Sequence, residues 1–247
     1  MIIENKTVFI TGGSSGIGKA LALSFVNRGN TVIVCGRDQK KLDKTKAEIP
    51  EVNTVKCDVS DENERSEIYN QIMEEFKRLD ILVNNAGIQR KIDLTKGLDD
   101  LLLNDDEIEI NFRSQVYLTA RFVPILSKQK EAAIVNVSSG LGFVPLSIFP
   151  IYSATKAAIH SYTMSLRHQL KNTPIKVFEL IPPTVYDTNL KGKPIEKTEW
   201  TVSSKDIADA TMEGLTKDTY QITVGASTRW VNGTNEDREN AFDGMNH

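Results

Sequence analysis

Near its amino terminus the chain reads TVFITGGSSGIG over residues 7–18. Thr7–Thr11 is a short run of apolar and β-branched residues ended by a glycine turn, which predicts a strand buried on both faces. Beyond the turn, Leu21 and Phe25 are four residues apart, which predicts a helix over residues 16–28. A glycine-rich turn at the start of a helix offers free backbone N–H groups and the positive end of the helix dipole, and both suit a pyrophosphate.

Strand and helix patterns continue to alternate along most of the chain. We expect further strands at 31–35, 52–57, 81–83, 134–137, 175–181 and 221–224, with helices at 39–48, 62–77, 105–128 and 152–171. Strands that alternate with helices are joined by right-handed crossovers, which build a parallel sheet with helices on both faces. The sequence therefore predicts a Rossmann-like, doubly wound α/β fold with about seven parallel strands.

Length and composition favour one globular domain over residues 1–247. The net charge of −3 and the pI of 5.7 give no basic footprint for nucleic acid. No apolar run reaches the ~20 residues that span a bilayer, and the first residues lack the form of a signal peptide. Two cysteines are too few for a disulfide framework, and no cluster has the spacing of metal ligands. We expect a cytoplasmic protein without a metal, a membrane span or a nucleic-acid partner.

Two segments break the alternating pattern. Residues 183–202 contain two prolines, one glycine and Trp200, and we interpret them as a loop that covers the substrate. Residues from about 232 to 247 are polar and aperiodic, which predicts a poorly ordered tail.

The glycine turn has other interpretations. Its spacing, Gly12-x-x-x-Gly16-x-Gly18, differs from the usual Gly-x-Gly-x-x-Gly fingerprint, so a simple tight turn is one alternative. Residues 12–16 also match Gly-x-Ser-x-Gly, the nucleophile elbow of serine hydrolases, with Ser14 as the nucleophile.

A serine hydrolase also needs a histidine in a loop beyond a late strand. His160 and His168 fall inside an expected helix, and His247 ends the chain. These positions disfavour the hydrolase interpretation.

Residues 36–38 follow the second strand, where dinucleotide-binding proteins contact the adenosine ribose. An acidic side chain there favours NAD, whereas this chain has Gly36 followed by Arg37, whose guanidinium suits a phosphate. The sequence therefore favours NADP(H), with NAD(H) as the alternative. Alternatively, Arg37 is a solvated loop residue and Asp38 is a helix cap, and neither residue then indicates which cofactor binds. Position 15 is a serine, where many NADP users have a basic residue, and this weakens the preference for NADP(H).

A tyrosine and a lysine stand four residues apart at 152 and 156, which places Tyr152 and Lys156 on one helix face. A phenol with a pKa near 10 is a poor base at neutral pH. We expect the Lys156 ammonium to lower that pKa, and an oxidised nicotinamide to lower it further. Such a group could exchange a proton with an alcohol or a carbonyl. Upstream, Ser138 and Ser139 end a predicted strand, where a hydroxyl could bind the substrate oxygen.

Together these motifs resemble the short-chain dehydrogenase/reductase family over residues 7–225, in its compact branch. The shared motifs are Thr11-Gly12-x-x-x-Gly16-x-Gly18, Asn84-Asn85-Ala86-Gly87, Asn111, Ser139 and Tyr152-x-x-x-Lys156. The sequence also looks like a bacterial subgroup of uncharacterised oxidoreductases of the DltE type.

The resemblance implies a role for each matching residue. Tyr152 would be the catalytic acid/base, Ser139 would position the substrate oxygen, and Lys156 would bind the nicotinamide ribose. Asn111 would hold a water in a proton relay, and Asp58 would contact adenine. Ser138 is the less favoured hydroxyl, because Ser139 has the family's offset of thirteen from the tyrosine. Expected cofactor contacts are Gly12, Ser14, Ser15, Gly16, Ile17, Gly18, Arg37, Asp58, Val59, Asn84, Ala86, Gly87, Tyr152, Lys156, Pro182 and Val185.

The chain departs from the family after the sixth strand. The family usually has Pro-Gly there, whereas this chain has Pro182-Pro183 and one extra residue before Thr188. Val185 could still meet the carboxamide, but a pyrophosphate contact from Thr188 is left open.

The resulting expectation is an NADP(H)-dependent oxidoreductase that interconverts a carbonyl and a secondary alcohol. The substrate would be partly apolar, and the chain would form a homodimer or homotetramer through the helices at 105–128 and 152–171. A dinucleotide-sensing protein without catalysis is an alternative, which the presence of Ser139, Tyr152 and Lys156 disfavours. Candidate apolar residues around the substrate are Leu141, Phe143, Phe149, Tyr186, Leu190 and Trp200.

Overall fold

A single parallel sheet organises the computed structural model, which describes residues 1–102, 106–188, 190 and 195–246. Among these residues, seven strands lie in the order β3-β2-β1-β4-β5-β6-β7, and each neighbouring pair is parallel. This confirms the predicted fold. The strands are β1 (Thr7–Thr11), β2 (Thr31–Gly36), β3 (Asn53–Lys56), β4 (Ile81–Asn84), β5 (Ala132–Val137), β6 (Ile175–Ile181) and β7 (Gln221–Thr223).

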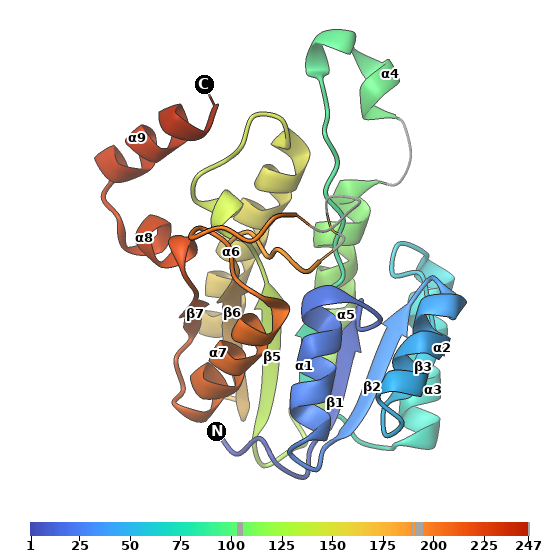
Figure 1. The fold of residues 1–247 in the computed structure, drawn as a ribbon. Helices are drawn as coiled ribbons and strands as arrows, with labels where there is room; N and C mark the ends of the chain where they lie inside the picture. The colour runs from blue at the N-terminus through green and yellow to red at the C-terminus, as the bar shows by residue number, and fades with distance from the viewer. Residues whose placement is uncertain (103–105, 189, 191–194, 247) are drawn as a thin grey trace.

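Helices cover both faces of the sheet (Figure 1). Side chains of α1, α2 and α7 belong to the core on one face, and those of α3, α5 and α6 to the core on the other. The helices are α1 (Gly16–Val26), α2 (Gln39–Glu48), α3 (Glu62–Glu75), α4 (Leu98–Leu101), α5 (Ser114–Leu126), α6 (Pro150–Gln169), α7 (Ser204–Thr216), α8 (Ala226–Asn232) and α9 (Asn235–Asn246). None of those in the described part of the chain is long and apolar enough to cross a membrane.

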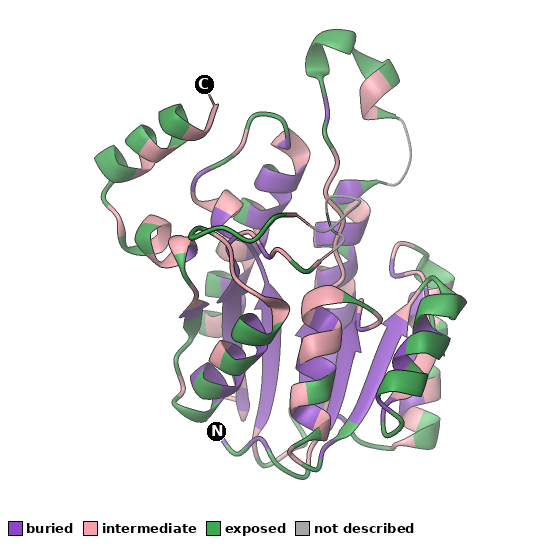
Figure 2. Ribbon diagram, viewed as in Figure 1, coloured by how far each residue is buried: buried purple, intermediate pink, exposed green. Residues whose placement is uncertain are grey.

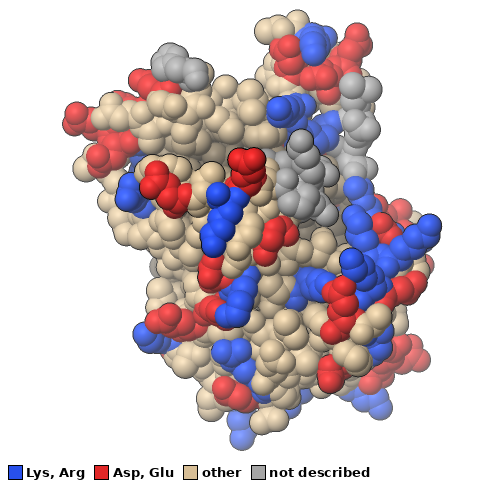
Figure 3. Space-filling model, viewed as in Figure 1, with Lys and Arg blue, Asp and Glu red and all other residues tan. Residues whose placement is uncertain are grey.

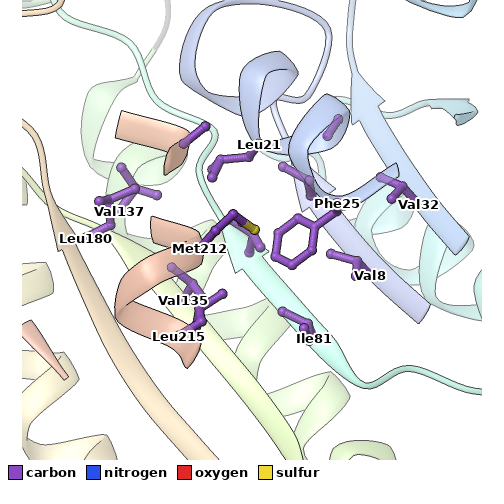
Figure 4. Packing of buried hydrophobic residues seen from close by; sticks show 14 of the residues in the cluster. Val8, Leu21, Phe25, Val32, Ile81, Val135, Val137, Leu180, Met212 and Leu215 are labelled. Atoms are coloured by element: carbon purple, nitrogen blue, oxygen red, sulfur yellow. The ribbon is translucent and has the colours of Figure 1, made fainter. Parts of the chain in front are cut away.

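The strands inside the sheet, β1, β2, β4, β5 and β6, are largely apolar runs because both of their faces are buried (Figure 2). Along β1, Val8 faces the core under α1 and α7, while its neighbour Phe9 faces the opposite core. Phe25 of α1 and Met212 of α7 lie side by side over the sheet (Figure 4). Burying a side chain such as Phe25 contributes about 2–3 kcal/mol to the stability of the fold. The helices packed on the two faces of the sheet fix where the strand ends lie.

The strand order changes direction between β1 and β4. β2 and β3 lie on one side of β1, whereas β4 and the later strands lie on the other side. β1 pairs with β2 on one side and with β4 on the other. A crevice forms where the connections from two such strands diverge, and ligands of open α/β sheets bind there, outside the carboxyl ends of the strands. In Figure 1 this edge of the sheet is at the top.

The prediction of a poorly ordered tail from residue 232 is wrong for the described residues. The chain forms α8 and then α9, which begins after a reciprocal cap: the Thr234 hydroxyl accepts the Asp237 N–H at 3.1 Å, and an Asp237 oxygen accepts the Thr234 N–H at 2.8 Å. Asn246 then accepts the Ser147 N–H at 2.6 Å. No residue of α9 is buried, so apolar periodicity could not reveal a helix that capping and tethering stabilise.

Candidate active site

A cavity of about 530 Å³ lies at the carboxyl ends of the strands and brings most of the predicted site residues together. Its wall includes Gly12, Ser14, Ser15, Gly16, Ile17, Arg37, Asp58, Val59, Ala86, Gly87, Ser139, Tyr152, Lys156, Pro182 and Val185. Three predicted residues, Gly18, Asn84 and Asn111, lie outside this wall.

The glycine turn forms one side of the cavity through close backbone approaches. Gly12 and Gly16 have φ angles of 65° and 51°, which L side chains rarely adopt. A Cβ on Gly18 would lie 2.4 Å from the carbonyl oxygen of Gly12, so this glycine packs α1 against the turn and does not contact the cavity. The Ser15 side chain makes no cap hydrogen bond to α1, which leaves first-turn N–H groups for an anion.

Asn85 fixes this turn against the strand that ends beside it. Its side-chain amide donates to the carbonyl oxygens of Thr11 at 2.9 Å and Gly12 at 3.2 Å, and its backbone N–H donates to the Thr11 hydroxyl at 3.0 Å. The expected cofactor contacts omitted Asn85, although its place in the Asn-Asn-Ala-Gly motif was a signal. Asn84 instead points into the sheet and donates to Thr119 and Asn136, both at 2.9 Å.

The far end of the cavity is bordered by Arg37, Asp38 and Lys41. Basic side chains gather over α2 in the space-filling view (Figure 3). Asp58 also lines this end, and one of its carboxylate oxygens accepts the N–H and the hydroxyl of Ser60. Position 36 carries no acidic side chain, because it is a glycine. A Cβ on Gly36 would lie 3.0 Å from the Ser14 hydroxyl oxygen.

Ser139 and Tyr152 face each other at the other end of the cavity. Tyr152 is buried on α6, and the Ser139 hydroxyl forms a hydrogen bond that favours its phenolate and so works to lower its pKa. Ser138 points the other way, toward β6, and donates to a Glu179 oxygen at 2.6 Å. This arrangement agrees with the preference for Ser139 over Ser138.

Lys156 does not make Tyr152 acidic in the protein alone, contrary to the expectation from spacing. Burial, opposed by the Ser139 hydrogen bond and assisted by the charge of Glu107, raises the pKa of Tyr152 to about 12. Lys156 is also buried, which lowers its own pKa to about 8. Its ammonium lies 5.5 Å from the Tyr152 ring centroid and donates to the Val137 carbonyl at 2.8 Å. Desolvation is therefore the largest cause of the shift in both pKa values.

Replacing Lys156 with Met should stabilise the protein at pH 7 by up to about 3 kcal/mol, because it removes a buried charge. Folding lowers the lysine pKa from 10.5 to about 8, so the cost is full below pH 8 and vanishes as pH rises toward 10.5. Urea unfolding of both proteins at pH 7 and pH 10 would measure the difference. An equal difference at the two pH values would contradict this account of Lys156.

Asn111 holds the chain beside the cavity. Its side chain donates to the Ile88 carbonyl at 2.9 Å, accepts the Ile88 N–H at 2.8 Å, and donates to the Thr155 hydroxyl at 3.3 Å. It lies in a π-helical turn, Glu109–Arg113, that precedes α5. The helical stretch predicted near 105–128 is observed from residue 107 to Leu126, with the π-helical turn inside it, and residue 105 is outside the described residues.

The segment after β6 returns to the glycine turn despite its extra residue. A Cβ on Gly16 would lie 3.0 Å from a Thr188 methyl group, and Thr188 lines the cavity. Val185 pairs with Val202 as an isolated bridge, which fixes both ends of the predicted substrate loop. Within that loop, residues 189 and 191–194 are outside the described residues. Thr188 is thus near the glycine turn.

The lining of the cavity differs in part from the apolar residues that we expected around a substrate. Leu141 and Leu190 line it, whereas Phe143, Phe149, Tyr186 and Trp200 do not, and Trp200 is 56% exposed. Trp230 of α8 takes this place: a Cβ on Gly140 would lie 2.5 Å from its ring. Trp230 could not be predicted from the sequence, because no local pattern connects α8 with residue 140. Other residues at this end are Ile88, Gln89, Thr184 and Ile195.

The serine hydrolase interpretation finds no support in the described residues. Ser14 lines the cavity near Gly36, whereas His160 is on α6 and bonds to Glu179 at 2.9 Å. His168 lies near the end of the same helix, and His247 is outside the described residues. No described hydrogen bond joins Ser14 to a histidine.

The cavity at the carboxyl ends of the strands joins the glycine turn to a serine, a tyrosine and a lysine, Ser139, Tyr152 and Lys156. The profile of the short chain dehydrogenase family matches residues 6–199, so the chain belongs to that family of oxidoreductases. The uncharacterized oxidoreductase DltE of Bacillus subtilis is 44% identical over 249 residues, which cover 100% of this chain and 98% of DltE.

Solved structures of short-chain dehydrogenases share the fold. One from Burkholderia phymatum, in complex with NAD, has a TM-score of 0.83 at 23% identity and covers 100% of this chain and 98% of its own. Another from Burkholderia cenocepacia, in complex with NADP, has a TM-score of 0.81 at 23% identity and covers 99% of both chains.

Proposed function

We propose that this chain interconverts a carbonyl compound and a secondary alcohol with NADP(H), and that Tyr152 is the acid/base. The observation that carries this proposal is the convergence of Ser139, Tyr152 and Lys156 in the cavity that begins at the glycine turn. When bound, the nicotinamide would supply or accept the hydride.

Tyr152, Ser139 and Lys156 each have a separate role in the proposed reaction. In the direction of reduction, the Tyr152 hydroxyl donates its proton to the substrate oxygen as negative charge develops there. The Ser139 hydroxyl binds that oxygen and orients it toward the phenol. The Lys156 ammonium, held by the Val137 carbonyl, supplies positive charge beside the phenol and a donor for the ribose of the cofactor.

The walls of the cavity fit a dinucleotide. The close contact that a Cβ on Gly12 would make, 2.9 Å from Ala86 Cα, shows a backbone surface without room for side chains. Such a surface lets phosphate oxygens approach the N–H groups of α1. Arg37 and Lys41 at the far end favour the additional phosphate of NADP over the plain ribose of NAD.

Replacing Arg37 with Glu should shift the preference from NADPH toward NADH. The substitution removes a phosphate donor and introduces repulsion, so the ratio of kcat/KM for NADPH to that for NADH should fall about 10- to 100-fold. Lys40→Glu makes a similar charge change on α2 outside the cavity wall and should leave the ratio nearly unchanged. A wild-type enzyme that prefers NADH would overturn the assignment.

A panel of ketones, aldehydes and alcohols, followed by NADPH absorbance, tests the proposed reaction. We expect turnover of partly apolar compounds, because Ile88, Leu141 and Trp230 line the substrate end. Tight NADPH binding without turnover of any compound would instead favour a dinucleotide-sensing protein.

We also infer that copies of the chain associate through α6. Small or apolar side chains on its exposed face, Ala154, Ala157, Ser161 and Met164, would permit close helix packing. Light scattering should therefore give the mass of a dimer or a tetramer, and the mass of a monomer would contradict the inference.

A further inference from the structure

Glu107 is a buried acid that the proposed reaction does not use. It is 1% exposed, four residues before Asn111, and burial raises the pKa of its carboxyl group. One oxygen accepts the Arg90 N–H at 3.0 Å. The other makes no hydrogen bond with the described residues and lies 3.8 Å from Arg90 Nε. Burying a carboxyl group is costly, so its placement calls for an explanation.

Glu107 and Asn111 hold the same short segment of backbone. Asn111 takes both the N–H and the carbonyl of Ile88, and Glu107 takes the N–H of Arg90, two residues later. Between these anchors is Gln89, which lines the cavity together with Ile88. The oxygen of the Gln89 side chain is buried and has no hydrogen-bond partner among the described residues. The anchored segment therefore presents an apolar side chain and an amide to the substrate end.

The same anchors connect this segment with the tyrosine. Asn111 donates to the Thr155 hydroxyl, which in turn donates to the Tyr152 carbonyl at 2.8 Å. We propose that Glu107 is a positioning residue, whose carboxylate fixes the backbone of residues 88–90 relative to Tyr152 and so sets the place of the substrate. The effect on catalysis rests on the proposed function, whereas the effect on the backbone does not.

The charge of Glu107 adds a second effect that can be measured separately. It is one of the causes that raise the Tyr152 pKa, whereas the Ser139 hydrogen bond lowers it. The charged groups that face Glu107 are Arg90, from the anchored segment, and Asp106, from its own element. Removing the charge favours the phenolate, so a profile controlled by Tyr152 should move to lower pH.

Three variants separate these effects. Glu107→Ala removes both the acceptor and the charge, Glu107→Gln keeps an acceptor and removes the charge, and Asp99→Asn removes a charge from the exposed surface of α4. If Glu107→Ala does not fold, Glu107→Met fills the volume without supplying the amide or carboxylate acceptor.

Amide hydrogen exchange tests the backbone effect without any turnover. Exchange at the Arg90 amide should become about tenfold faster in Glu107→Ala, as expected for the loss of one hydrogen bond to a charged group. Glu107→Gln and Asp99→Asn should stay within about threefold of wild type. An unchanged rate in Glu107→Ala, or in Glu107→Met in its place, would overturn the proposal even if the enzyme reduces carbonyls.

Steady-state kinetics test the effect on the reaction. KM for the carbonyl should rise about tenfold in Glu107→Ala, and the pH profile of kcat should move to lower pH in Glu107→Gln. Asp99→Asn should reproduce both wild-type values. A Glu107→Gln profile that coincides with wild type would overturn the role of the charge. Absence of turnover in wild type would refute the proposed function, while the exchange result would still decide the backbone effect.

Discussion

Tyr152→Phe should reduce turnover by about 10³-fold, because the variant lacks the hydroxyl that exchanges a proton with the substrate oxygen. The phenyl ring of the variant fills the same space, and Lys156 keeps its bond to the Val137 carbonyl, so the cavity should keep its shape. We therefore expect NADPH to bind with an affinity within a few-fold of wild type. Initial rates of carbonyl reduction and the fluorescence of bound NADPH measure the two quantities on one preparation.

Tyr162→Phe is the matched control, because Tyr162 is on the same helix and packs in the core beneath the sheet. It should keep turnover near the wild-type rate. Equal turnover in Tyr152→Phe and Tyr162→Phe would remove Tyr152 from the mechanism.

Gly18→Ala should be strongly damaging, because Gly18 packs α1 against the glycine turn. The new Cβ would lie 2.4 Å from the Gly12 carbonyl oxygen and 2.5 Å from the Asn85 amide nitrogen, and the first of these is backbone that α1 and β1 hold. Separating the helix from the turn should cost about 1–3 kcal/mol of stability and weaken NADPH binding at least about tenfold. Denaturant unfolding and NADPH titration give both values.

Gly244→Ala introduces the same methyl group where no atom lies within 4 Å. It is within α9, where alanine is a better helix former than glycine, so its stability should stay equal or rise slightly. If Gly18→Ala behaves like Gly244→Ala, close packing of α1 on the turn is not what shapes the cradle.

The sheet could be predicted closely because each strand carries its own signal. A parallel strand buried on both faces is a continuous apolar run, and Thr7–Thr11 and Ile175–Ile181 have the predicted bounds. Helix α9 carried no such signal, since caps at Thr234 and contacts of Asn246 hold it without burial.

The site was predictable where spacing alone places residues together. The four-residue spacing of Tyr152 and Lys156 and the position of Ser139 at a strand end bring all three to one cavity. Contacts between segments that are far apart in the sequence could not be predicted. Examples are the contact of Trp230 with Gly140 and that of Thr188 with Gly16.

The balance of charge and burial that sets the pKa of Tyr152 could not be predicted from the sequence either. Spacing predicted that Lys156 lowers the pKa of Tyr152, but the phenol is buried and Glu107 adds a negative charge. Desolvation depends on the whole surrounding structure, which no local motif records.

The pH dependence of alcohol oxidation with NADP⁺ shows whether Tyr152 is the acid/base. The protein alone raises the pKa of Tyr152 to about 12, so a working enzyme must ionise this phenol more easily in the complex with the positively charged cofactor. The account predicts that kcat/KM rises with pH through an ionisation below that value, and that Tyr152→Phe loses this ionisation. An identical pH profile in Tyr152→Phe would contradict it.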